Sequence, residues 1–224
     1  MAMGLLFSSP LGVAAGIDRT GERLGALELK IFGHIEIGTF FPNHRISVAK
    51  RPSHLRVGIN FGSARFGLDR DVIDDYLAAL RQVQPIADYL CANLSAPGAG
   101  RDGNSAEVRQ LLGDLRAERD RLEAGNGRRT PLLVKFNGGM AGEPLPFALQ
   151  VARDLDLDGI VLVCADLPRI ADVRKTIGEA ALISVGGVRD GDDVALRLGA
   201  GADLVQTHRA FADKGAAAFR HFGK

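Results

Sequence analysis

The 224-residue chain has no tryptophan, only two cysteines and no long apolar run. Two cysteines exclude a disulfide framework, and no apolar stretch approaches the ~18 residues that span a membrane. With 28 basic and 27 acidic residues the net charge is +1, which gives no field to attract nucleic acid or an anionic membrane. The apolar start is split by Ser8, Ser9 and Pro10 and has no basic flank, so no signal peptide is predicted. We therefore expect a cytoplasmic protein that binds a small molecule.

Glycine, in contrast, is abundant at 28 residues, which suits many strand-to-helix turns. Continuous apolar runs, typical of strands buried on both faces, occur at 11–15, 34–38, 55–59, 87–94, 131–136, 159–163, 181–185 and 202–207. Helical patterns separate most of them, at 21–30, 68–83, 106–124, 143–155, 169–177, 190–198 and 211–222. Residues 40–54 carry prolines near both ends and predict a loop or a degenerate helix. Eight strand-then-helix repeats predict one domain over residues 1–224, an α/β protein with a compact (β/α)8 TIM barrel.

The unit at 181–208 holds the most informative turn, because Gly186 and Gly187 stand where a strand becomes a loop. Glycine lets the backbone approach a ligand with its N–H groups free, and an anion there would also lie near the N-terminus of the next helix. In (β/α)8 barrels a phosphate site is often built from the loops after strands seven and eight. The alternative is a tight turn without a ligand. In its context the pattern favours a phosphate site.

Residues at the carboxyl ends of barrel strands converge on one mouth, and here that set includes Thr39, Asn60, Asn93, Lys135 and Cys164. Lys135 lies within an apolar strand, where it stabilises an anionic cofactor, forms a Schiff base, or extends its ammonium to solvent. The two asparagines either satisfy loop backbone or hold a heterocycle. Cys164 is an acid/base candidate or a buried strand residue. The five histidines show no metal-ligand spacing, so no metal site is predicted.

At this point the chain resembles the dihydroorotate dehydrogenases, FMN-dependent barrel enzymes. The resemblance extends over nearly the whole chain and rests on the order of short motifs: Pro-Leu-Gly-Val-Ala-Ala-Gly-Ile-Asp at 10–18, His-Ile-Glu-Ile-Gly-Thr at 34–39, Gly-Ile-Asn-Phe-Gly at 58–62, Asn-Leu-Ser-Ala-Pro at 93–97, Leu-Val-Lys at 133–135, Val-Gly-Gly at 185–187 and Gly-Ala-Gly-Ala-Asp-Leu-Val-Gln at 199–206.

The resemblance implies a role for each matching position. Ala15 and Gly16 would lie against the flavin, and Thr39, Asn60 and Asn93 would hydrogen-bond it. Lys135 would sit near the ring edge that gains negative charge on reduction. The FMN phosphate would be held by a further set: Gly186, Gly187, His208 and Arg209, of which Arg209 stands where the family usually has a small hydroxyl residue. For assembly, the resemblance implies a homodimer.

The departures from the family pattern concern the substrate. Ala96 stands where the family has the serine or cysteine that takes the substrate proton, and a lost general base typically slows a reaction by about 10²- to 10⁴-fold. Arg19 replaces a lysine of the orotate pocket, while Gly98 and Cys164 replace asparagines, so that Asn93 is the only pocket asparagine left. The loops after strands two and six are shortened.

These observations predict an FMN-binding oxidoreductase, a flavoprotein, that acts on a small molecule other than dihydroorotate. In this hypothesis Arg19 and Asn93 contact the substrate, and the catalytic acid or base is unassigned, with Lys135 and Cys164 as candidates. One alternative is a flavin-binding relative that has lost catalysis. Another is a Schiff-base lyase that uses Lys135 on a phosphorylated carbonyl substrate.

Overall fold

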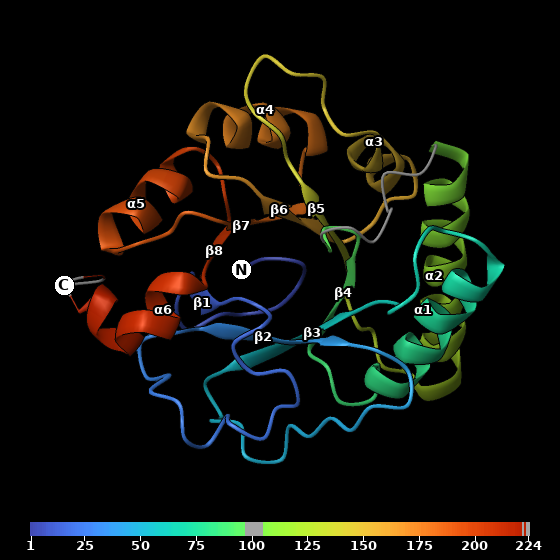
Figure 1. Ribbon diagram of the computed structural model, residues 1–224, viewed down its shortest axis with the longest axis horizontal. Helices are drawn as coiled ribbons and strands as arrows, with labels where there is room; N and C mark the ends of the chain where they lie inside the picture. The colour runs from blue at the N-terminus through green and yellow to red at the C-terminus, as the bar shows by residue number, and fades with distance from the viewer. Residues whose placement is uncertain (97–104, 221, 223–224) are drawn as a thin grey trace.

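A computed structural model describes residues 1–96, 105–220 and 222 and shows a closed barrel of parallel strands (Figure 1). Each strand pairs with the next along the chain, and β8 pairs with β1 to close the barrel. The strands are β1 Leu11–Val13, β2 His34–Phe40, β3 Arg56–Phe61, β4 Tyr89–Asn93, β5 Leu132–Asn137, β6 Gly159–Val163, β7 Ala181–Val185 and β8 Leu204–Thr207. Each predicted run overlaps one strand, which confirms the (β/α)8 class. The predicted pocket position Gly98 lies outside the described residues.

Six of the predicted helical segments contain a helix: α1 Arg70–Val83, α2 Ser105–Asn126, α3 Phe147–Asp154, α4 Leu167–Ile177, α5 Gly191–Gly199 and α6 Arg209–Lys214, which a 3₁₀ helix follows at Gly215–Phe219. The Asp69 side chain caps α1 by accepting from the Val72 N–H at 3.0 Å. Pro144 and Pro146 delay α3 beyond the predicted start at 143, because a proline disfavours helical geometry in the residue before it. Gly215 ends α6 with a φ of +60°, so the predicted helix at 211–222 is split.

The side of the barrel around β2 is covered by irregular chain rather than by helices, whereas α6 lies beside β1 (Figure 1). Residues 14–33 and 41–55, all of which the structure describes, form turns and irregular chain. Of the loop or degenerate helix predicted at 40–54, the loop is found at 41–54, while Phe40 ends β2; the helix predicted at 21–30 is wrong. The Asp18 carboxylate accepts from the N–H groups of Gly21 at 2.8 Å and Arg23 at 3.0 Å, and the core takes Leu24 and Leu29, which are five residues apart. That spacing does not form one helical stripe, so tertiary contacts override helix propensity.

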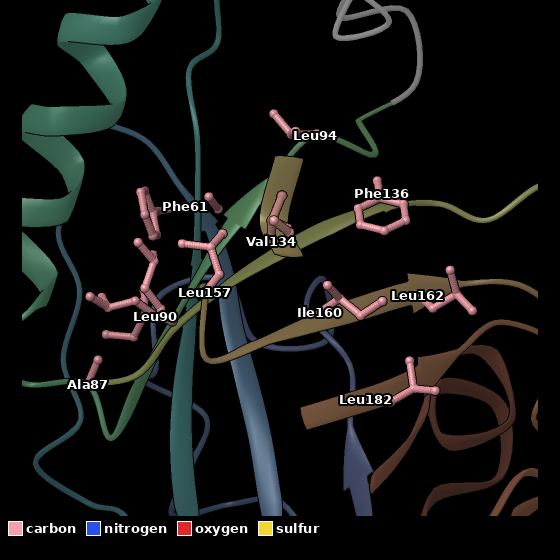
Figure 2. Packing of buried hydrophobic residues seen from close by; sticks show 14 of the residues in the cluster. Phe61, Ala87, Leu90, Leu94, Val134, Phe136, Leu157, Ile160, Leu162 and Leu182 are labelled. Carbon is pink, nitrogen blue, oxygen red and sulfur yellow. The ribbon is translucent and has the colours of Figure 1, made fainter. Parts of the chain in front are cut away.

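The strands place alternate side chains on two buried faces. Outward-facing residues pack beneath the helices, and Figure 2 shows this row on three neighbouring strands: Val134, Phe136, Ile160, Leu162 and Leu182. Inward-facing residues fill the lumen as a separate cluster that includes Tyr89, Cys91, Leu133, Val161 and Ile183. Because the side-chain period of a strand is two, this alternation decides which residues can reach the mouth.

Two glycines in the lumen make room for rings on the next strand. A Cβ on Gly12 would lie 2.2 Å from Nε2 of His34, and a Cβ on Gly58 would lie 2.1 Å from the Tyr89 ring. Gly12 faces His34 across the β1 and β2 pairing, and Gly58 faces Tyr89 across the β3 and β4 pairing. The lumen is therefore filled by rings seated over glycines. Among the described residues, no helix is both long and apolar enough to cross a membrane.

Candidate functional site

A cavity of about 260 Å³ opens at the carboxyl ends of β1 to β5. It is lined by most of the residues that the sequence places at strand ends: Ala15, Gly16, Arg19, Thr39, Asn60, Asn93 and Lys135, together with Phe41. Small-molecule sites usually start near 300 Å³, so this cavity takes one ring system rather than a whole nucleotide.

A continuous chain of hydrogen bonds forms the polar wall of this cavity. The Ser95 hydroxyl donates to Asn93 Oδ1 at 2.8 Å, and Asn93 Nδ2 donates to Thr39 Oγ1 at 3.0 Å. The Thr39 hydroxyl then donates to Asn60 Oδ1 at 2.9 Å, and Asn60 Nδ2 donates to Glu36 Oε2 at 3.2 Å. Each amide is oriented by the next member, so the donors and acceptors of the wall are held in fixed positions.

The chain ends on a buried ion pair that sequence reasoning missed. Glu36 is fully buried in the lumen, and its Oε2 lies 4.0 Å from Nζ of Lys135. Its other oxygen accepts from Gln206 Nε2 at 2.7 Å. An ammonium in this lumen would be costly without a countercharge, and Glu36 supplies one. The sequence does contain a signal for this pair: Glu36 stands between Ile35 and Ile37, as the only acid in an apolar strand.

Two other groups near Glu36 in the lumen, the Tyr89 hydroxyl and the Cys91 thiol, carry no charge near neutral pH. Burial raises the pKa of the Tyr89 hydroxyl, and the negative charge of Glu36 adds to that effect. Burial and then Glu36 also raise the pKa of the Cys91 thiol, so both groups keep their protons. Gln206 Oε1 is buried and has no partner among the described residues. The charge that faces the cavity from the lumen is therefore that of Lys135, balanced from below by Glu36.

The glycine corner lies beside this cavity, on the loops after β7 and β8. Gly186 and Gly187 have φ values of +106° and +71°, which favour glycine. His208 follows β8 and reaches toward β1, since a Cβ on Gly16 would lie 2.9 Å from His208 Nε2. Burial, and then the positive charges of Lys135 and Arg209, lower the pKa of His208, so its ring is neutral near pH 7. Gly16 thus joins the cavity to the corner.

One expectation about this corner is wrong. The N-terminus of α5 was expected to favour an anion, but the Asp190 carboxylate already caps it and accepts from the Asp193 N–H at 3.0 Å. Asp192 and Asp193 add negative charge to the same turn. The electrostatics of this helix end therefore oppose an anion. Any positive charge at the corner comes from side chains instead.

The candidates for proton transfer are not all at the mouth. Cys164 belongs to the outward-facing cluster beneath the helices, where its Sγ accepts from the Asp166 N–H at 3.2 Å and donates to the Gly139 carbonyl at 3.3 Å. It does not line the cavity, because Val163 takes the inward position at the end of β6. The structure therefore does not support Cys164 as an acid or base there. Ala96 is half-buried, and its side chain has no polar atom.

Among the described residues, no group of three or more His, Cys, Asp or Glu side chains is placed to hold a metal ion. The polar groups at the mouth are amides, a hydroxyl and two cations, Arg19 and Lys135. Such a set recognises the N–H and C=O groups of a heterocycle, with a positive charge for an anionic form of it.

No family model matches the sequence. The chain is 28% identical to the dihydroorotate dehydrogenase (quinone) of Stenotrophomonas maltophilia strain K279a over 278 positions, which cover 96% of this chain and 79% of that protein. It is 27% identical to the enzyme of the same name from Xanthomonas axonopodis pv. citri strain 306, with the same coverage. Both alignments are longer than the chain itself, so they contain gaps in this chain.

Solved structures agree on the fold. The ligand-free dihydroorotate dehydrogenase of Eimeria tenella superimposes with a TM-score of 0.82 at 22% identity, covering 97% of this chain and 83% of that one. The complex of that enzyme with ferulenol gives a TM-score of 0.79 at 20% identity, covering 96% and 80%. The sequence matches, which extend over nearly the whole chain, support membership of the dihydroorotate dehydrogenase family, and the solved structures show the shared barrel fold.

Proposed function

We propose that this protein binds FMN at the mouth of the barrel and catalyses a redox reaction on a small molecule other than dihydroorotate. The observation that carries the proposal is the wall formed by Thr39, Asn60 and Asn93, held in place by the buried pair of Glu36 and Lys135. Burying a row of polar amides beside a cation costs free energy, so such a row is expected where it binds a ligand. A flavin ring, with alternating N–H and C=O groups, suits such a wall.

The residues present fit the cofactor in two parts. The cavity takes the ring system, with Ala15 and Gly16 as the small residues against it and Thr39, Asn60 and Asn93 as its polar partners. The corner would hold the phosphate, through a set that lies around the ends of β7 and β8: Gly186, Gly187, His208 and Arg209. Gly16 connects the two parts, because only a hydrogen there leaves His208 in place.

Bound FMN would supply two-electron chemistry, accepting a hydride from the substrate. Lys135 would stabilise the negative charge that develops on the cofactor. Glu36 holds the ammonium in the lumen and keeps it pointed at the cavity. Arg19 is exposed, lines the cavity and has no ion-pair partner among the described residues. It would therefore bind an anionic group of the substrate.

The loop after β4 lacks a proton acceptor suited to dihydroorotate. Ala96 has no polar side-chain atom, and the Ser95 hydroxyl donates its proton to Asn93 Oδ1 at 2.8 Å while the Ser95 N–H donates to the same oxygen at 2.9 Å. Ser95 is therefore committed to orienting Asn93. We infer that dihydroorotate is oxidised about 10²- to 10⁴-fold more slowly than with a general base in place.

The missing base also supports a second candidate, a flavin-binding relative without catalysis. The lyase hypothesis is weaker, because it gives no role to the wall formed by Thr39, Asn60 and Asn93. Turnover with a panel of small anionic reductants and an artificial electron acceptor separates an active enzyme from an inactive binder.

The direct test is titration of the purified protein with FMN, followed by flavin fluorescence. We expect saturable quenching and a flavin absorption band that bleaches under dithionite. Lys135→Met should weaken binding, because it leaves Glu36 as an unpaired anion below the ring. Lys175→Met is the matched control, since Lys175 is an exposed lysine on α4 away from the mouth. Failure of the wild-type protein to bind FMN refutes the proposal. Borohydride trapping of a carbonyl compound at Lys135 supports the lyase instead.

Ala96→Ser tests the substrate assignment. If the rest of the pocket still accepts dihydroorotate, this variant gains its oxidation by about 10²-fold or more, because the hydroxyl restores an acceptor at the family position. We expect no such gain, since Arg19 has also replaced a residue of the orotate pocket. A large gain would show that the protein is a dihydroorotate dehydrogenase that lost only its base.

A further inference from the structure

Arg197 on α5 is a buried cation beneath the glycine corner. It is 3% exposed, and its Nη1 donates to the Cys164 carbonyl at 2.8 Å and to the Ser184 hydroxyl at 2.6 Å. Its Nη2 donates to the Gly186 carbonyl. One guanidinium thus joins the end of β6, the strand β7 and the first glycine of the corner.

The acceptors around Arg197 are all neutral. No carboxylate lies within ion-pair distance of it in the part of the chain that the structure describes, and Asp193, one turn earlier on α5, pairs with Arg189 at 2.8 Å instead. Burial lowers the pKa of Arg197, and the negative charge of Asp193, beyond ion-pair distance, offsets only part of that effect. A buried guanidinium with no anion in direct contact is costly, so the position favours an anion that the described residues do not place there.

The backbone at Gly186 and Gly187 would place that anion at the Gly187 N–H. A peptide unit is planar and trans, so holding the Gly186 carbonyl toward Arg197 makes the Gly187 N–H point the opposite way, away from the guanidinium. Gly187 is exposed, and its N–H has no backbone acceptor among the described residues. Nη2 of Arg197 would lie only 3.5 Å from a Cβ built on Gly187, so the charge is close beneath the turn.

We propose that Arg197 is the positioning residue that makes this corner select a phosphate group, so that the protein binds FMN in preference to riboflavin. Its charge acts from below the turn, and its hydrogen bond presents the Gly187 N–H to the phosphate. This inference rests on the proposed function for the ligand, but its basis is the unpaired buried charge and the fixed peptide. If the inference is correct, Arg197 on α5 determines the affinity for the phosphate but not the affinity for the flavin ring.

Arg174 provides a matched control. It also binds backbone carbonyls, at 2.9 Å to Gly201, 2.6 Å to Gly178 and 3.0 Å to Ala180, but it has the Asp203 carboxylate as a partner at 2.6 Å. A purely structural role for Arg197 predicts that Arg174→Met and Arg197→Met have similar effects. A phosphate-directed role predicts that they differ.

The experiment measures the dissociation constants of FMN and riboflavin for the wild type and for Arg174→Met, Arg197→Lys and Arg197→Met. We expect Arg197→Met to lower the preference for FMN over riboflavin by about tenfold to a hundredfold, through loss of FMN affinity alone, as charge-assisted contacts of this kind are lost. Arg197→Lys should retain part of the preference, because it keeps the charge but not the fork of donors. Arg174→Met should retain all of it.

Thermal unfolding of the ligand-free proteins with inorganic phosphate gives a second readout. The wild type and Arg174→Met should gain melting temperature as phosphate rises, more than in chloride of equal ionic strength, and Arg197→Met should lose that difference. An unchanged preference and an unchanged phosphate effect in Arg197→Met overturn the inference. If Arg197→Met does not fold, Arg197→Lys and the wild-type phosphate effect decide it.

The outcomes separate the two proposals. Wild-type protein that binds FMN and riboflavin equally well supports the proposed function and refutes the role of Arg197. Wild-type protein that binds neither flavin refutes the proposed function, and the phosphate-dependent melting then tests the anion site by itself. Phosphate stabilisation that disappears in Arg197→Met would support the site, and its absence in the wild type would refute it.

Discussion

His34 makes the stability of this protein sensitive to acid. It is fully buried in the lumen on β2, with the Phe7 ring edge-on at 5.6 Å between centroids and Gly12 on the neighbouring strand. Both ring nitrogens lack a hydrogen-bond partner among the described residues. Burial lowers its pKa from 6.5 to about 3, because a charged imidazolium would lose its hydration there without compensation.

The sign of the effect follows from the two states. The unfolded chain takes up a proton at His34 as the pH falls below 6.5, whereas the folded protein does so only near pH 3. The folded state therefore loses stability across that window and has no such penalty above it. At about 1.4 kcal/mol per pH unit, the loss is about 2 kcal/mol by pH 5 and about 3 kcal/mol by pH 4. This is a sizeable share of the ~5–15 kcal/mol typical of a domain.

Urea unfolding of the wild type and of His34→Leu between pH 7 and pH 4 measures this term. The variant has its own cost at pH 7 from the different shape of its side chain, so the comparison uses the change with pH rather than the absolute stability. We expect the wild type to lose about 2 kcal/mol more than His34→Leu between pH 7 and pH 5. His44→Gln is the control, because His44 is exposed, and it should follow the wild type. Equal pH dependence in wild type and His34→Leu would refute the reasoning.

Two further predictions concern packing and charge in the lumen. Glu36→Gln leaves the ammonium of Lys135 buried without a countercharge and should lower the free energy of unfolding by about 3–5 kcal/mol in urea; a loss below about 1 kcal/mol would mean that the pair is solvated. Gly58→Ala places a Cβ 2.1 Å from the Tyr89 ring and should destabilise the barrel severely, whereas Gly113→Ala, on α2 with nothing within 4 Å, should raise the free energy of unfolding by about 0.5–1 kcal/mol. Similar effects of the two alanines would contradict the account of glycine in the lumen.

Local patterns in the sequence were sufficient for the barrel. Continuous apolar runs predict strands buried on both faces, and β6 and β7 occupy the predicted residues without a change of bounds. The helix pattern at 68–83 is realised as α1, since its apolar stripe faces the barrel and Asp69 caps its first turn. The pattern at 21–30 failed: Asp18 accepts from the N–H groups of Gly21 and Arg23, three and five residues further along the chain, and holds this segment as turns.

The sequence predicted those site residues that are polar and stand at the carboxyl end of a strand. Thr39, Asn60, Asn93 and Lys135 each end or closely follow a strand, and barrel closure brings them to one cavity. Cys164 met the same criterion but faces outward, because side chains alternate and the last inward position on β6 is Val163. One residue of register separates a cavity residue from a residue under a helix.

The sequence by itself determined the class of fold, the strand ends and the polar residues available there, because these depend on local composition and on the period of the apolar residues. Only the tertiary structure decided which charges meet. Lys135 and Glu36 are paired, whereas Arg197 is buried among neutral acceptors. Such partners come from separate strands and helices, so their distances are set by the closure of the barrel and not by spacing along the chain.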